Sequence, residues 1–132
     1  MKNSLIKKTL WILLGACCTS TWALDATTLE KQYAAQANQA PSVSRGEQFF
    51  QSKHGKEWSC ASCHKSPPTS DGLHASTNKS IAPLAPAFNA KRFTDEAKVN
   101  KWFKRNCNDV LGRECTVVEK ADVMAYLNSL KK

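Results

Sequence analysis

Cys60-Ala61-Ser62-Cys63-His64 places two thiols three positions apart and follows the second thiol directly with an imidazole. This pattern is the attachment signature for c-type haem. Two thiols at this spacing reach the two vinyl groups of one porphyrin and form thioethers, and the next residue then lies under the iron. The pentapeptide therefore predicts one covalent haem c, with Cys60 and Cys63 as thioether residues and His64 as the proximal iron ligand.

Other kinds of site fit the same cysteines less well. A structural zinc site needs four ligands, and Cys107 and Cys115 are too far apart to form the usual second pair. A thioredoxin-like redox pair needs alternating strands and helices, and no strand pattern is evident. A plain disulfide within the motif leaves the role of His64 unexplained. Haem attachment is the interpretation that accounts for all three residues.

The first 23 residues have the parts of a secretory signal peptide. Residues 1–8 carry three lysines and no acid, and Thr9–Cys18 is an apolar run too short to span a bilayer. Thr21-Trp22-Ala23 then offers the small residues that a signal peptidase reads. We predict cleavage after Ala23, export to the periplasm, and one cytochrome c domain over residues 24–132.

Two alternatives for this N-terminus remain open. Leu14-Gly15-Ala16-Cys17 resembles a lipoprotein cleavage box, in which Cys17 would be acylated and would anchor the protein to a membrane. An uncleaved anchor is the other alternative, and the short apolar run disfavours it. We predict the soluble protein that cleavage after Ala23 would give.

Composition and charge limit the class of protein. Charged residues make up 23% and hydrophobic residues 42%, which is typical of a soluble globular domain. Loss of residues 1–23 removes three lysines and lowers the formal net charge from +8 to +5. This excess favours an acidic partner surface. The basic residues are spread along the chain without a basic run or a nucleic-acid module, so no nucleic-acid partner is expected.

The secondary-structure signals are helical. Capping residues, Ala- and Glu-rich composition and apolar residues at three- and four-residue steps predict an all-α fold, and Thr116 and Glu119 form a capping-box pattern. The expected helices are Asp25–Gln39, Ser44–Gln51, Thr94–Arg105 and Thr116–Leu130. The second and the last are expected to cross near the haem edge, in a small haem-wrapping, class I–like cytochrome c.

A long loop separates the second of these helices from the third. Lys53–Ala90 holds all but one of the five prolines, and so long a loop in a small domain needs something other than secondary structure to organise it. A chain wrapped around a haem satisfies that need. Within the loop, a backbone carbonyl near Pro83 is a candidate to hold the second nitrogen of His64. A plain rigid wall is the equal alternative.

Residue spacing leaves the sixth iron ligand undecided. Met124 is a candidate by residue type, although a methionine in the middle of an apolar helix is usually core. His54 lies in a charged stretch and is expected at the surface. His74 lies in a polar loop and is a weaker candidate for a second histidine ligand. An open sixth position is the remaining alternative.

Several segments beyond the haem motif resemble one known family. They are Ile81–Pro86 (IAPLAP), Arg92-Phe93-Thr94-Asp95, Lys101-Trp102, Arg105–Cys115 (RNCNDVLGREC) and Glu119-Lys120-Ala121-Asp122. They look like the sphaeroides haem protein (SHP) family of monohaem, class I–like cytochromes. The Asn-Cys-Asn segment with a second cysteine eight residues later is its most specific mark. The likeness covers nearly the whole chain after the signal and is weakest over Asp25–Ser44 and Pro67–Ser80.

The resemblance implies roles that spacing alone does not give. It implies that Asn106 is the sixth ligand of the oxidised iron, that the ligand is lost on reduction, and that Cys107 and Cys115 form a disulfide. It implies an all-helical exported protein that works with a dihaem c-type cytochrome and a membrane b-type cytochrome. Single-electron transfer is the expected function, rather than an enzymatic one. The alternative is binding or processing of small diatomics such as O2, NO and CO by the reduced protein.

Overall fold

The computed structural model describes residues 24–132, so the predicted signal peptide and the lipoprotein box at Cys17 lie outside the described residues. The elements are α1 (Ala26–Ala37), α2 (Val43–Gln51), α3 (Cys60–His64), β1 (Gly72–Leu73), β2 (Ser80–Ile81), α4 (Glu96–Leu111) and α5 (Val117–Ser129). The predicted all-α class is confirmed. β1 and β2 form only a two-residue antiparallel ladder that pairs Gly72 with Ile81. None of the described helices is long and apolar enough to cross a membrane.

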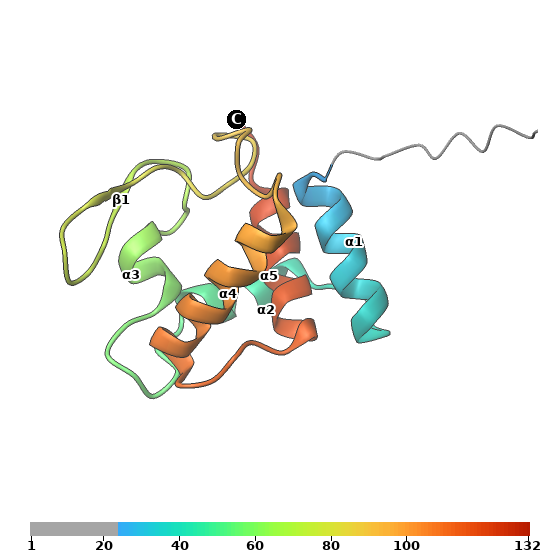
Figure 1. Ribbon diagram of the computed structural model, residues 1–132, viewed down its shortest axis with the longest axis horizontal. Helices are drawn as coiled ribbons and strands as arrows, with labels where there is room; N and C mark the ends of the chain where they lie inside the picture. Colours follow the sequence, from blue (N-terminus) through green and yellow to red (C-terminus); the bar gives the residue numbers. More distant parts are fainter. Residues whose placement is uncertain (1–23) are drawn as a thin grey trace, which may run out of the picture.

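α5 is the centre of the core. Seven consecutive residues, Ala121–Leu127, are buried, and both α1 and α2 pack closely against this helix. The predicted capping box is present, because Thr116 Oγ1 accepts from the Glu119 amide and a Glu119 carboxylate oxygen accepts from the Thr116 amide. In the view of Figure 1, α1 lies on one side of α5, and α3 with the β1–β2 loop lies on the other. The bundle therefore leaves a wall of α5 available to a site.

The contact between α2 and α5 is set by a glycine and an ion pair. A Cβ on Gly46 would lie 1.9 Å from the Asp122 carbonyl oxygen, so only glycine permits this approach of the two helices. Asp122 is buried, and its carboxylate accepts from the Ser42 amide and from two guanidinium nitrogens of Arg45 at 2.6–2.8 Å. The pair satisfies the buried charge and fixes α2 across α5.

α4 differs from its predicted bounds at both ends. Asp95, rather than Thr94, is the N-cap, because its carboxylate accepts from the Lys98 amide at 2.9 Å. The helix then passes Arg105 and ends at Leu111, where Gly112 adopts a φ of +72°. This extension places Asn106 and Cys107 inside the helix rather than after it.

Side chains attach α4 to the bundle. The Tyr33 hydroxyl donates to the Asn100 carboxamide oxygen at 2.9 Å, and the Tyr33 and Phe103 rings meet edge to face at 5.9 Å. The Lys120 ammonium lies 5.6 Å from the centre of the Tyr33 ring. α1, α4 and α5 are therefore joined at one polar and aromatic junction.

Candidate haem site

The CASCH motif forms its own short helix, α3. Ser59 is buried at the N-cap, where its hydroxyl accepts from the Ser62 amide while the Ser62 hydroxyl accepts from the Ser59 amide at 2.9 Å. This reciprocal pair of hydrogen bonds makes Ser59 the N-cap, and the helix begins at the next residue, Cys60. Residues three and four positions apart share a helix face. Cys60, Cys63 and His64 accordingly all border the same cavity, and both thiols are free.

The cavity has a volume of about 540 Å³ and walls from four helices and the central loop. Such a volume falls in the range of about 300–1,000 Å³ that holds organic ligands in proteins. Most of the wall is apolar or aromatic: Phe49, Phe50, Trp58, Ile81, Leu84, Phe93, Val99, Phe103, Val110, Val123 and Leu127. An apolar chamber with two thiols and one imidazole at its edge fits a haem c.

His64 is in the state that binds iron. Burial lowers its pKa to about 4, with smaller contributions from the positive charge of Arg92 and from His74. The ring is therefore neutral at pH 7, and a neutral imidazole has a free nitrogen lone pair for a metal. The Phe50 ring lies 6.3 Å away, centre to centre. His64 can act as a ligand over the whole physiological pH range.

Cys60 is a protonated thiol in the absence of a bound group. Burial raises the pKa of its thiol to about 11, so the thiol keeps its proton at neutral pH. Thiolates, rather than thiols, bind metals. In residues 24–132 no group of three or more His, Cys, Asp or Glu side chains gathers as a metal centre. The described residues therefore supply no cluster of ligands for the zinc alternative.

The Pro83 carbonyl has other partners than His64. It accepts from the Arg92 Nε at 2.9 Å and from the Asn89 side-chain amide at 3.3 Å. The Pro83 carbonyl itself is thus occupied by two polar side chains of the following turn, and a neighbouring backbone carbonyl as the partner of His64 stays a prediction. Within residues 24–132 the His64 ring makes no hydrogen bond. Arg92, which the sequence marked only as part of a family segment, is thus a structural residue of the site.

The hairpin after α3 packs directly on the motif. A Cβ on Gly72 would lie 1.9 Å from the Cys63 carbonyl oxygen, and the Ala75 amide donates to Cys63 Sγ at 3.3 Å. Backbone therefore touches backbone here. No pattern of neighbouring residues in the sequence predicts this contact, because it joins residues that only the tertiary fold brings together.

α4 forms a second wall of the cavity. Asn106 is half-buried and borders the cavity together with its neighbour Cys107. Lys98 and Arg105, on the same helix, border its exposed rim. The structure thus brings Asn106 to the same chamber as the CASCH residues, although more than forty positions separate them.

The other candidate sixth ligands occupy different places. Met124 is fully buried in the core and is not among the residues that border the cavity. The His54 Nε2 lies 2.8 Å from the Phe49 carbonyl oxygen, its ring meets the Phe49 ring at a tilt of 41°, and it does not border the cavity. His74 does border the cavity, and its Nδ1 lies 3.2 Å from the Ser76 hydroxyl. Of the three, only His74 shares the chamber with Asn106.

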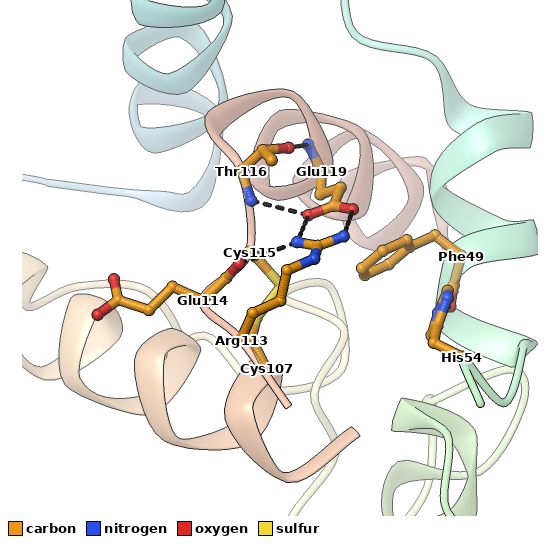
Figure 2. Close-up of a disulfide and its surroundings, with 8 residues drawn as sticks. All are labelled: Phe49, His54, Cys107, Arg113, Glu114, Cys115, Thr116 and Glu119. Carbon is orange, nitrogen blue, oxygen red and sulfur yellow. Dashed lines mark hydrogen bonds and ion pairs between the residues drawn. A yellow bond between two sulfur atoms is a disulfide. The ribbon is translucent and has the colours of Figure 1, made fainter. Parts of the chain in front are cut away.

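Cys107 and Cys115 are joined by a disulfide with a Cα–Cα distance of 5.5 Å. The loop that they close is held to α5 by Arg113, whose two terminal nitrogens donate to the two Glu119 carboxylate oxygens at 2.7 and 2.8 Å. Figure 2 shows this pair beside the disulfide, with the Phe49 and His54 rings next to it. The disulfide therefore connects the residue after Asn106 to the start of the core helix.

Comparisons with known proteins agree with this site. Residues 36–127 match a family model described as a domain of unknown function (DUF1924). The chain is 41% identical to cytochrome c'' of Methylophilus methylotrophus over an alignment of 133 positions, which covers 91% of this chain and 92% of that protein. It is 46% identical to the cytochrome c-type protein SHP of Cereibacter sphaeroides over 99 residues, which cover 72% and 76%.

Solved structures give the same result. The structure described as oxidized SHP, an oxygen binding cytochrome c, matches with a TM-score of 0.75 and 43% identity, over 80% of this chain and 97% of the other. Oxidized cytochrome c'' from Methylophilus methylotrophus matches with a TM-score of 0.72 and 42% identity, over 81% and 95%. By sequence, fold and the residues around its cavity, the chain belongs to the SHP family of monohaem c-type cytochromes, and its cofactor is a haem c.

Proposed function

We propose that this protein is an exported, periplasmic single-electron carrier whose reduced haem iron is five-coordinate. The observation that supports this proposal is the shared cavity, which brings two free thiols and a neutral imidazole from α3 to the same chamber as Asn106 from α4. When bound, haem c supplies one-electron chemistry between ferric and ferrous iron. The thiols of Cys60 and Cys63 would hold it as thioethers, and His64 would be its permanent ligand.

Asn106 is the residue that would make the sixth position depend on oxidation state. An amide oxygen is a hard, neutral donor, and such donors bind ferric iron better than the softer ferrous iron. The side chain borders an apolar part of the cavity, near Val99, Phe103 and Val110. Because water competes poorly there, a weak ligand can hold its place in the oxidised state. Reduction then releases Asn106 and leaves His64 as the only protein ligand.

A second candidate function has one specific observation in its favour. The solved structure of oxidized SHP is described as that of an oxygen binding cytochrome c. A five-coordinate ferrous site in this chain would likewise be open to O2, NO or CO from the Asn106 side. Binding or processing of such a diatomic is therefore the alternative to electron transfer, and both functions need the same ligand release.

The charge of the surface supports a protein partner. Lys53, Lys56 and Lys65 are exposed in the segments next to α3, whereas the Lys104 ammonium is paired with the Glu114 carboxylate at 3.0 Å. Exposed cations beside a redox site speed the encounter with an acidic partner. A dihaem c-type cytochrome and a membrane b-type cytochrome are the partners that the family relationship suggests.

Replacement of Asn106 tests the proposal. Asn106→Ala should keep the haem attached, alter the ferric visible spectrum and raise azide affinity for the ferric protein by about tenfold. Asn108→Ala is the matched control, since Asn108 lies on the same helix, is exposed and does not border the cavity. Spectra of the oxidised and reduced proteins with and without CO would report ligand release directly.

Two outcomes would contradict the assignment. A wild-type protein without a Soret band would remove the haem proposal altogether. An Asn106→Ala protein with an unchanged ferric spectrum and unchanged azide affinity would exclude Asn106 as the ligand. His74 would then be the next residue to replace, because it also borders the cavity.

A further inference from the structure

Arg92 lies between two cavities. It borders the haem cavity on one side and a second, open cavity of about 330 Å³ on the other, and it is half-buried. Its guanidinium donates from Nε to the Pro83 carbonyl and from Nη2 to the Ala82 carbonyl. Two backbone acceptors of the IAPLAP loop thus fix the group against the wall of the site.

The charge of Arg92 is not neutralised by the protein. Arg45 and Arg113 each pair with a carboxylate at 2.7–2.8 Å, whereas across residues 24–132 no carboxylate lies within ion-pair distance of Arg92. Its two acceptors are neutral carbonyls. Burial lowers its pKa, but an arginine in a protein keeps its proton at neutral pH. The wall therefore carries a fixed, partly desolvated positive charge.

The field of this charge reaches the proximal ligand. Arg92 and His64 border the same cavity, so the fixed guanidinium charge opposes further positive charge on the His64 side of that cavity. The same interaction applies to positive charge on a metal that His64 holds. Ferrous iron carries one positive charge less than ferric iron, so a nearby fixed cation favours the ferrous state.

We propose that Arg92 raises the reduction potential of the haem that His64 ligates, and so favours the reduced state in which Asn106 is released. The inference rests on the proposed function, because it assumes His64 as the iron ligand. The two walls then act in opposite directions: the amide of Asn106 stabilises ferric iron, and the guanidinium of Arg92 stabilises ferrous iron. The difference between the two effects sets the potential at which the sixth ligand is lost.

The central test is a potentiometric titration of the holoproteins. Arg92→Gln should shift the ferric–ferrous equilibrium about tenfold toward ferric, as expected for the loss of one partly desolvated charge. A tenfold shift of a one-electron couple corresponds to about 59 mV. Arg92→Lys retains the charge and should shift the equilibrium by less than about threefold. Lys101→Gln is the control, because Lys101 is exposed and does not border the cavity, and solvent screens its charge.

A second pair of variants leaves Arg92 and its two hydrogen bonds in place. Thr94 borders both cavities together with Arg92 and is exposed, so Thr94→Glu places a carboxylate near the guanidinium. Its potential should fall below that of Thr94→Gln, which has the same shape without the charge. A fall would show that charge at this wall acts on the iron, even if Arg92→Gln does not fold.

The outcomes separate the inference from the proposed function. If the wild type carries no covalent haem, the proposed function fails and the inference fails with it. If haem is attached and the potentials of Arg92→Gln and Thr94→Glu equal those of their controls, only the inference is overturned. An equal fall in Arg92→Lys and Arg92→Gln would also overturn it, because that result assigns the effect to the two hydrogen bonds instead of the charge.

Discussion

The two helices that face the haem cavity are built in opposite ways. α3 has five residues, and its backbone is touched directly by the backbone of the next hairpin at Gly72. α4 has sixteen residues, yet in the described part of the chain it packs less closely against its neighbours than α1 or α2 packs against α5. The short helix is thus held along its backbone, and the long helix is held by side chains and one disulfide.

This difference matches the roles proposed for the two walls. A residue that must stay on the iron, His64, belongs on the wall whose backbone is fixed. A residue that must leave and return, Asn106, belongs on a wall that can move slightly without breaking the core. Local stability in proteins varies in this way, and ligand-binding elements come from the less stable parts. Four experiments test this difference between the two walls.

The largest effect is expected on the α3 wall. The double variant Cys60→Ala/Cys63→Ala should carry no covalent haem, because both proposed thioether sulfurs are gone. Haem staining of a denaturing gel measures this directly. The Cys107→Ala/Cys115→Ala protein serves as the control with the same number of replaced cysteines on the other wall, and it should keep the stain. Haem loss from both proteins would mean that haem attachment depends on the cysteines of both walls.

The next largest effect is expected from the disulfide itself. Its two cysteines are eight positions apart, and closure of so short a loop stabilises a protein by about 2.5 kcal/mol. Cys107→Ala/Cys115→Ala should lose about that much free energy of unfolding in urea, and its ferric azide affinity should rise because Asn106 is held less firmly. Labelling of the folded wild-type holoprotein should detect no free thiol. Two labelled cysteines would refute the disulfide.

Two glycines permit a comparison of backbone contacts. Gly46→Ala and Gly72→Ala each place a Cβ 1.9 Å from a backbone oxygen, and such overpacking costs about 2 kcal/mol. Only Gly72→Ala should also change the haem spectrum, because its neighbour is Cys63 rather than Asp122. Gly55→Ala is the control: its Cβ would meet nothing within 4 Å, so only its φ of +80° opposes the change. Equal spectral changes in Gly46→Ala and Gly72→Ala would show that the backbone contact at α3 affects the haem no more than the contact between α2 and α5.

The smallest effect is expected at the exposed end of the disulfide loop. A hydrogen bond from Arg113 holds the pKa of Glu119 below its ordinary value of 4.5, so the folded protein binds fewer protons there than the unfolded chain. The resulting stabilisation is complete above pH 4.5 and is lost as the pH falls through the lowered pKa. Glu119→Gln keeps a capping side chain and should lose only this contribution. The stabilities of wild type and variant should therefore differ slightly at pH 7 and converge as the pH falls below the lowered pKa of Glu119.

The sequence predicted the features of the fold that depend on neighbouring residues. The start of α5 is an example, because Thr116 and Glu119 lie three positions apart and the capping box needs nothing else. α4 was predicted too short, since the basic residues up to Arg105 resemble a helix end. The true end depends on Gly112, which alone adopts a left-handed conformation there. Its start was missed because Thr94 and Asp95 are both good caps and only the structure separates them.

The candidate site divides in the same way. Cys60, Cys63 and His64 follow from spacing within five residues, and Asn106 with the disulfide follows from the family resemblance. Gly72 and Arg92 act through contacts with Cys63 and Pro83 that only the folded chain creates. The Pro83 carbonyl shows the same effect, because its two donors, Asn89 and Arg92, could not be named from the sequence.

The central place of α5 has a consequence for the order of events when the protein is made. Every other described element precedes this helix in the chain, and α1 and α2 both need it as their packing surface. A nascent chain that ends before Val117 therefore has no core on which to collapse. Folding of this domain therefore cannot begin until residues 117–129 have been made. The same order leaves the CASCH segment, where we propose that haem attaches, accessible until α5 closes the chamber.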